Sequence, residues 1–449
     1  MKQKTEFVCS NCGARSPKWQ GKCNSCGSWD TFIEDVQIST SKRITKKLLK
    51  SDAVFLKDIA LDGEIRITTS IKELDRVLGG GIIPGSLILV GGDPGIGKST
   101  LMLQMCRGFG NYKPLYATGE ESLRQIAFRA KRLDGTPDDL SIIAETNIEI
   151  INSAILSSDY DLAIVDSIQS VFTDKVDQAP GSIAQVRECA ALLMNTAKKS
   201  GKPVFIIGHV TKDGMIAGPK LLEHMVDTVL QFEGDKTYSF RILRALKNRY
   251  GSTNEIGIFE MCEQGLKEVI NPSEIFLAQR KSEDSGVAVV AAMEGARPLL
   301  LEVQALVSPT GFAVPQRTTT GFDLRRLNMI LAVLEKRLGE KFRMMDVFVN
   351  VAGGIYLNDP AVDLGIAAAL VSSLRDKPID SNTLLIGEIG LTGEVRSVSA
   401  MEQRLSEAEK LGFKRAFVSS AASKKISKSF NMKIMPVERI SLAFAELFD

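Results

Sequence analysis

One short segment constrains the fold of this chain more than any other feature. Residues 92–99 read Gly-Asp-Pro-Gly-Ile-Gly-Lys-Ser and fit the pattern G-x4-G-K-[ST]. An apolar segment at 86–90 precedes them and an expected helix at 100–109 follows them, which is the strand–loop–helix order that the pattern requires. Glycines let successive backbone N–H groups surround a phosphate, and the helix N-terminus adds the positive end of its dipole. The segment therefore predicts a phosphate-binding loop on a parallel sheet.

This loop and a carboxylate beyond it form the expected nucleotide site. Lys98 offers a cation to the β- and γ-phosphates, and Ser99 offers its hydroxyl to Mg2+. Asp166 ends the apolar segment 161–166, which we expect to be a strand next to the one before the loop, so that the carboxylate holds the water shell of the metal. The expected cofactors are ATP and Mg2+. The expected nucleotide-binding residues are Gly92, Asp93, Pro94, Gly95, Ile96, Gly97, Lys98, Ser99, Thr100 and Asp166.

Hydrolysis also needs a group that orients water, and the sequence offers two adjacent glutamates. Glu120 and Glu121 follow an apolar strand at 114–118, at the carboxyl edge of the expected sheet. We expect Glu120 to be the catalytic residue; which of the two orients the water stays open, and either charge is also explained by a helix N-terminus. His209, after the strand at 203–208, is either a sensor of the γ-phosphate or a structural histidine.

Two cations are expected side by side near residue 250. In Lys247-Asn248-Arg249, at the end of a strand, residues two apart share a face, so both cations point the same way. They repel each other unless an anion lies between them. If the pair acts in trans, the anion is the nucleotide of a neighbouring subunit. The alternative is that both cations lie on a solvated surface.

The cysteines cluster at the N-terminus. Two C-x2-C pairs, with ten residues between them, predict two thiolate knuckles around one tetrahedral Zn2+; the expected ligands are Cys9, Cys12, Cys23 and Cys26. Four protein ligands close such a site, so this zinc is structural, and free thiols or redox pairs are the alternative interpretation. Lysines and tryptophans beside it either touch nucleic acid or pack on a protein neighbour; they are Lys18, Trp19, Lys22 and Trp29.

The alternation of apolar strands and helices after residue 56 predicts an α/β fold. We expect a zinc ribbon or knuckle at 1–35, a basic linker at 36–55, a P-loop ATPase core at 56–270 and a second α/β domain at 271–449. The formal net charge is only +2, so an anionic partner must be held by a local patch. No apolar stretch reaches the ~20 residues that cross a bilayer, and no signal sequence is seen. We therefore expect a cytoplasmic protein without a membrane partner.

The order of these features resembles the bacterial RadA (Sms) family of DNA-repair proteins over essentially the whole chain. Beyond the cysteines and the loop, the resemblance rests on Tyr116-Ala-Thr-Gly-Glu-Glu-Ser122, Gly208-His-Val-Thr-Lys-Asp-Gly214 and Lys247-Asn-Arg-Tyr-Gly251, where the family has Phe instead of Tyr250. It implies a RecA-like, DNA-dependent ATPase that forms a homohexameric ring, translocates on single-stranded DNA and extends recombination intermediates by branch migration. It also implies that Lys247 and Arg249 lie at a subunit interface and that a recombinase or replicative helicase is a partner.

By analogy with RecA-like motors, two loops are expected to bind DNA inside the ring. They are residues 172–187 and 210–220, and the candidate phosphate contacts are Arg187, Lys212 and Lys220. Such cations bind phosphates without reading sequence, so DNA binding is expected to weaken steeply as salt rises.

Residues 345–449 are similar to the proteolytic domain of Lon proteases, which use a Ser–Lys dyad. At the matching positions this chain has Asp363 and Glu402, and neither replaces its counterpart chemically. We therefore expect a non-proteolytic scaffold for ring assembly. Its candidate DNA surface is basic, although a solvated helix face explains the same charges: Lys336, Arg337, Lys341 and Arg343.

Two rival functions stay open. An ATP-dependent peptidase requires a Ser–Lys pair close together within 345–449, and Ser372, Ser373 and Lys377 lie in that region but out of register. An ATP-gated adaptor, in which the nucleotide switches a zinc-bearing docking surface, requires slow turnover that is indifferent to DNA.

Overall fold

The computed structural model describes residues 4–9, 14–29, 31–37, 66–110, 112–133, 140–208, 220–234, 240–277, 284–352 and 355–448. The chain divides into two compact units. The first comprises residues 1–233, 243–253 and 261–268, and the second comprises 234–242, 254–260 and 269–449. Two strands before residue 270, β10 (Phe240–Asn248) and β11 (Ile256–Cys262), therefore have residues in both units.

The N-terminal segment is a small antiparallel ribbon. Its strands are β1 (Lys4–Cys9), β2 (Arg15–Ser16) and β3 (Phe32–Gln37), in the order β2-β1-β3. Cys9, at the end of β1, pairs with Phe32, and these two side chains and Cys23 are its buried core. A core this small supplies little apolar burial, so a ribbon of this size depends on a staple such as a metal.

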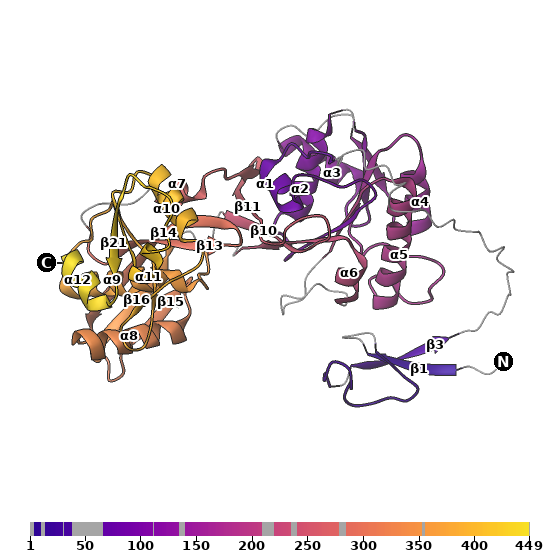
Figure 1. Cartoon of the computed structure of the whole chain (residues 1–449). Helices are drawn as coiled ribbons and strands as arrows, with labels where there is room; N and C mark the ends of the chain where they lie inside the picture. The colour runs from indigo at the N-terminus through magenta and orange to yellow at the C-terminus, as the bar shows by residue number, and fades with distance from the viewer. Residues whose placement is uncertain are drawn as a thin grey trace. The chain divides into compact units, whose positions relative to one another are not determined.

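A nine-stranded sheet carries the P-loop (Figure 1). Its order is β12-β11-β10-β9-β4-β8-β7-β5-β6, and β9, β4, β8, β7, β5 and β6 are parallel to one another. The strands not yet bounded are β4 (Leu87–Gly91), β5 (Pro114–Thr118), β6 (Ser141–Ala144), β7 (Leu162–Asp166), β8 (Val204–Ile207), β9 (Thr228–Glu233) and β12 (Gly265–Glu268). The helices are α1 (Lys72–Leu78), α2 (Lys98–Met105), α3 (Leu123–Arg132), α4 (Ile148–Leu156), α5 (Ile183–Ser200) and α6 (Lys220–Met225). Helices α4 and α5 lie side by side and share a buried cluster with β4, β5, β7 and β8.

One expectation about this sheet is wrong. The strand that ends at Asp166, β7, is not next to the P-loop strand β4, because β8 lies between them. The sequence gives the order of strands along the chain, but the crossover helices allow a later strand to insert between two earlier ones. All these strands are parallel, so their carboxyl ends still meet at one edge.

Local signals explain where two of the helices begin. Helix α3 starts at Leu123, because Ser122 is its N-cap and forms a capping box with Gln125. Helix α2 starts at Lys98, directly after the loop, and its expected last turn at 106–109 is a 3-10 helix. Helix α4, which was not expected, is capped by Asn147, whose side chain accepts hydrogen bonds from the N–H groups of Glu149 and Ile150.

The second unit is built on a seven-stranded mixed sheet with the order β15-β16-β14-β13-β17-β20-β21. The strands are β13 (Val287–Glu294), β14 (Arg297–Pro309), β15 (Arg317–Thr320), β16 (Met345–Val351), β17 (Thr383–Leu385), β20 (Arg415–Ser419) and β21 (Lys433–Val437). A separate two-stranded ribbon pairs β18 (Glu388–Ile389) with β19 (Val395–Arg396).

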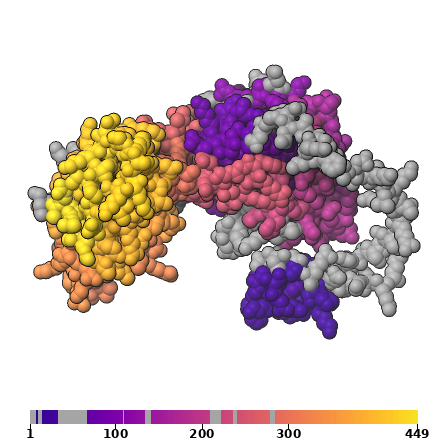
Figure 2. Space-filling model, in the orientation of Figure 1, coloured from indigo at the N-terminus to yellow at the C-terminus, as the bar shows by residue number. Residues whose placement is uncertain are grey.

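Helices cover both faces of this sheet. Side chains of β13 alternate between two buried clusters: Val290 packs with α8 (Leu324–Leu338), α9 (Asp363–Arg375) and α12 (Ile440–Phe448), whereas Val289 packs with α10 (Met401–Lys410). In Figure 2 these orange and yellow segments form one close-packed body. No helix within the described ranges has the length and apolar character needed to cross a bilayer.

Candidate active site

The loop between β4 and α2 has the backbone that the sequence pattern requires. Gly92, Gly95 and Gly97 have φ values of +145°, +80° and +119°, which side-chain-bearing residues rarely adopt. A Cβ on Gly92 would lie 2.9 Å from Cβ of Phe232, whereas a Cβ on Gly95 would meet no atom within 4 Å. The loop is therefore held against β9 on one side and open on the other, as a phosphate cradle needs.

Lys98 is the buried cation of this loop. Its Nζ donates hydrogen bonds to the carbonyl oxygens of Gly92, at 2.7 Å, and Asp93, at 2.9 Å. Burial lowers the pKa of Lys98, while the nearby carboxylates of Asp166, Asp93 and Glu120 act in the opposite direction. Ser99 and Thr100 follow in the first turn of α2, with half-buried side chains. These residues fit a nucleotide phosphate chain with its Mg2+.

Asp166, at the end of β7, accepts a hydrogen bond from a residue to which the sequence assigned no role. The hydroxyl of Tyr116 on β5 donates to Oδ2 of Asp166 at 2.5 Å, and both side chains are buried. Burial and then the charge of Asp166 raise the pKa of Tyr116 well above its usual value, so the phenol stays a donor. The signal was present in the sequence: a tyrosine in an apolar buried strand needs a partner for its hydroxyl.

The structure separates the two adjacent glutamates. Glu120 Oε1 accepts a hydrogen bond from the hydroxyl of buried Ser167, which directly follows Asp166. Glu121 instead forms an ion pair with Arg129 of α3 at 2.6 Å. Glu120 is also among the carboxylates whose charges act on Lys98 of the loop. Ser167, like Tyr116, was not singled out from the sequence.

The two cations at the end of β10 have different partners. Lys247 Nζ donates to the carbonyl oxygens of Glu223 at 2.7 Å and Val226 at 2.8 Å, so it binds the C-terminal end of α6 in its own chain. Arg249 forms an ion pair with Asp227 at 3.1 Å, and 47% of its side chain is exposed. Burial, followed by the charge of Arg249, lowers the pKa of Lys247.

Asp227 is a third residue that sequence analysis missed. Its side chain is almost fully buried, and Oδ2 accepts a hydrogen bond from the backbone N–H of Leu87 at 3.1 Å, while Oδ1 accepts from Arg249. A buried carboxylate with two such donors is fixed in orientation. Asp227 therefore links the first residue of the P-loop strand to the exposed guanidinium of Arg249.

The expected zinc ligands lie together as far as they are described. The Sγ atoms of Cys9, Cys23 and Cys26 are within 4.8 Å of one another, and those of Cys9 and Cys26 are 3.7 Å apart. Four sulfurs at ~2.3 Å around a tetrahedral zinc are about 3.8 Å apart, so the spacing fits this metal. Cys12, the fourth expected ligand, lies outside the described residues.

Comparison with known proteins decides the family. A DNA repair protein RadA from Halalkalibacterium halodurans is 54% identical over 424 residues, covering 93% of this chain and 93% of the relative. This chain belongs to the RadA family. The RadA proteins of Bacillus subtilis and Listeria monocytogenes are 49% and 50% identical, with 98% of both chains covered in each case. The resemblance drawn from the sequence motifs is confirmed.

Three family models match successive parts of this RadA-family chain. A rubredoxin metal binding domain matches residues 7–34, KaiC matches 67–153, and subunit ChlI of Mg-chelatase matches 322–422. With the sheets described above, they confirm the expected α/β class with a zinc ribbon at the N-terminus. A crystal structure of the RadB recombinase aligns with a TM-score of 0.37 and 22% identity, over 45% of this chain and 99% of that chain.

The predicted DNA contacts of this RadA-family chain are only partly described. Arg187 is exposed, but it lies on α5 and not in a loop. Lys212 and His209 lie outside the described residues, and Lys220 is the first residue of α6, with no described side chain. The loop before α5 is held by Gln185, whose Nε2 donates hydrogen bonds to the carbonyl oxygens of Val176 at 2.8 Å and Gln178 at 2.9 Å. Sequence analysis did not single out Gln185.

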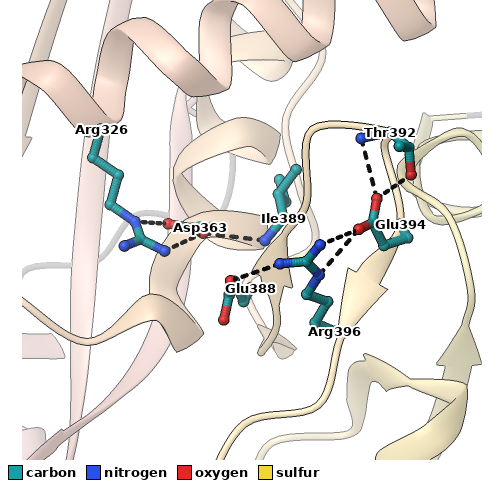
Figure 3. Close-up of polar contacts among 7 residues, drawn as sticks. All are labelled: Arg326, Asp363, Glu388, Ile389, Thr392, Glu394 and Arg396. Carbon is teal, nitrogen blue, oxygen red and sulfur yellow. Dashed lines mark hydrogen bonds and ion pairs between the residues drawn. The ribbon is translucent and has the colours of Figure 1, made fainter.

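The two positions that resemble the Lon dyad have unrelated partners. Asp363 begins α9, is buried, and receives two hydrogen bonds from Arg326 of α8, at 2.6 and 2.7 Å, and one from the backbone N–H of Ile389 at 3.1 Å (Figure 3). Burial raises the pKa of Asp363 in spite of these donors. Glu402 faces solvent on α10, where hydrogen bonds from the backbone and hydroxyl of Ser427 lower its pKa.

The serines and lysine of the peptidase alternative do not form a dyad. The hydroxyl of Ser372 accepts from the N–H of Gly286 and donates to the backbone carbonyl of Lys377, while Nζ of Lys377 donates to the carbonyl of Phe448. In the described part of residues 345–449, Nζ of Lys428 donates a hydrogen bond to Oγ of Ser406 at 2.9 Å, so these two side chains are close in space. This pair lies on the surface, whereas a lysine base needs burial or a neighbouring cation to lose its proton.

Proposed function

We propose that this chain is a DNA-dependent ATPase in recombinational DNA repair, which translocates on single-stranded DNA and promotes branch migration of recombination intermediates. One observation carries the proposal: Lys98, Asp166 and Glu120 gather around the P-loop, while a second site, at the end of β10, presents the exposed guanidinium of Arg249. The names of the curated relatives, DNA repair protein RadA, support the biological role.

Each residue of the first site has a part in hydrolysis. Bound Mg-ATP supplies the transferable phosphoryl group and the metal that neutralises its charge. Lys98 and the loop N–H groups would bind the phosphates, and Ser99 and Asp166 would hold the Mg2+ ion. Glu120 orients the attacking water and takes its proton, and Ser167 holds Glu120 toward the site.

We assign different tasks to the two cations of the Lys247–Arg249 pair. Lys247 is bound to the carbonyl oxygens of Glu223 and Val226, and so it ties the end of β10 to the C-terminal end of α6. Arg249, oriented by Asp227 and half exposed, is the residue that reaches the nucleotide of a neighbouring subunit. This arrangement requires a ring, which the family resemblance makes a homohexamer.

DNA lies in the ring channel in this proposal, bound by Arg187, Lys212 and Lys220 through its phosphates. Nucleotide state is transmitted through Arg249 and Lys247 to α6 and the segment before it. The partners are single-stranded DNA and, at recombination intermediates, a recombinase or replicative helicase. We infer a cytoplasmic localisation.

The C-terminal unit is a scaffold without peptidase activity in this proposal. The ion pair of Asp363 with Arg326 occupies the position at which Lon proteases have the nucleophile, and Glu402, at the position of the lysine, has no basic nitrogen. Four exposed cations at the end of α8 and after it offer a DNA-binding face: Lys336, Arg337, Lys341 and Arg343.

The test is ATP hydrolysis with and without single-stranded DNA. We expect stimulation by DNA in the wild type, loss of hydrolysis with Lys98→Ala, and loss of hydrolysis with retained nucleotide binding in Arg249→Ala. Mixing Lys98→Ala with Arg249→Ala subunits should restore activity, because about one quarter of randomly formed interfaces then pair an intact loop with an intact arginine.

Three results would count against the proposal. Turnover that ignores DNA favours the adaptor, and ATP-dependent degradation of an unfolded substrate favours the peptidase, with Ser406→Ala as the variant that locates it. Failure of the mixed subunits to regain activity, with both variants still assembled, removes the trans role of Arg249.

A further inference from the structure

We propose that Tyr116 is a positioning residue: its hydroxyl fixes one carboxylate oxygen of Asp166 so that the other oxygen faces the metal–nucleotide complex. The proposal rests on the ATPase function above and adds a residue to its metal site. The hydrogen bond from Tyr116 to Oδ2 of Asp166, at 2.5 Å between buried side chains, carries it.

The register of two neighbouring strands produces this contact. Strands β5 and β7 are parallel, and Thr118 lies opposite Asp166, so Tyr116 is two residues earlier on the same face of β5. The long phenol ring therefore extends along the sheet toward its carboxyl edge and ends at the carboxylate. The Tyr116 side chain is completely buried, so packing fixes the ring and the ring fixes Asp166.

This hydrogen bond from Tyr116 makes the two carboxylate oxygens of Asp166 inequivalent. Oδ2 is occupied by the phenol, while among the described residues none donates a hydrogen bond to Oδ1. Asp166 is also the carboxylate with the largest charge effect on Lys98, which places it at the phosphate cradle. A ligand oxygen aimed in advance loses less entropy when the metal binds, and outer partners of this kind commonly change metal affinity 10–100-fold.

A purely structural explanation exists, namely that the buried hydroxyl simply needs an acceptor. The two explanations differ in what they predict for Tyr116→Phe, which keeps the ring and removes the hydroxyl. A structural role affects nucleotide binding equally with and without Mg2+. A positioning role affects only the part of the affinity that Mg2+ contributes.

The experiment measures the affinity of the full-length chain for a fluorescent ADP in Mg2+ and in EDTA, for the wild type and Tyr116→Phe. We expect unchanged affinity in EDTA and a roughly tenfold loss of the Mg2+-dependent gain in Tyr116→Phe. The matched control is Tyr160→Phe, because Tyr160 is a partly buried tyrosine that directly precedes Asp161 and β7 and packs against a buried cluster to which Tyr116 does not belong. The control should match the wild type in both conditions.

A double-mutant cycle tests whether the effect passes through the carboxylate. In an Asp166→Asn background, Tyr116→Phe should cause no further loss of the Mg2+-dependent gain. The proposal is overturned if Tyr116→Phe leaves that gain unchanged, lowers affinity equally in EDTA, or acts additively with Asp166→Asn. If the wild type binds no nucleotide, or gains nothing from Mg2+, the ATPase function itself fails instead.

Discussion

The ion pair between Arg326 and Asp363 makes a quantitative prediction about the C-terminal unit. Replacing Arg326 by Leu keeps an aliphatic side chain but leaves the carboxylate of Asp363, which is only 2% exposed, without its cation. Removing one partner of a buried pair typically costs about 3–5 kcal/mol. Asp363 keeps the hydrogen bond from Ile389, so we expect the lower limit of that range.

The pH dependence follows from the raised pKa of Asp363. Burial raises it and Arg326 lowers it, so Arg326→Leu raises it further. Between the unfolded value of about 3.9 and the folded value, the folded state holds a proton that the unfolded state has released, so the free energy of unfolding falls as pH rises. Arg326→Leu should therefore be most destabilised near neutral pH and should approach the wild type as the pH is lowered.

Hydrogen exchange of the full chain, followed by mass spectrometry, measures the loss of local stability in the C-terminal unit. A loss of about 3 kcal/mol corresponds to roughly 150-fold faster exchange in α8 and α9 at pH 7. The double variant Arg326→Leu/Asp363→Asn removes both charges and should exchange within tenfold of the wild type, without the pH dependence. A single variant that exchanges like the wild type at pH 7 would contradict this role of the ion pair, as would a double variant that exchanges as fast as the single one.

Three further changes test the remaining sites. Glu120→Gln should lower kcat by about 10²–10⁴-fold with nucleotide binding intact. Glu121→Gln, which weakens only the ion pair with Arg129, should leave kcat unchanged. The opposite result would exchange the roles of the two glutamates. Elemental analysis should find one zinc per chain and none after Cys9→Ser, because the metal supplies roughly 10–16 kcal/mol to such ribbons; a wild type without zinc contradicts this. Gly92→Ala should abolish tight nucleotide binding, because the added Cβ meets Phe232. In the control Gly201→Ala, φ is +74° but the added Cβ meets no atom within 4 Å, so this change should cost only about 1 kcal/mol of stability and keep nucleotide binding intact.

The sequence alone determined the features that consecutive residues build. The phosphate loop needs only glycines and a lysine in order between a strand and a helix, and two C-x2-C pairs are enough to indicate a zinc knuckle. Because chain connectivity places these residues next to one another, no knowledge of the tertiary fold was needed. The alternation of strands and helices likewise predicted the α/β class, since it follows from local periodicity.

Which distant residues meet depends on the tertiary fold. Tyr116 and Asp166 are 50 residues apart, and Arg326 and Asp363 are 37 apart, so their contacts depend on strand register and helix packing rather than on local pattern. The same holds for the position of β8 between β4 and β7 and for the different partners of Glu120 and Glu121. Lateral strand order and side-chain direction are set by how buried faces pack together, and a linear sequence states neither.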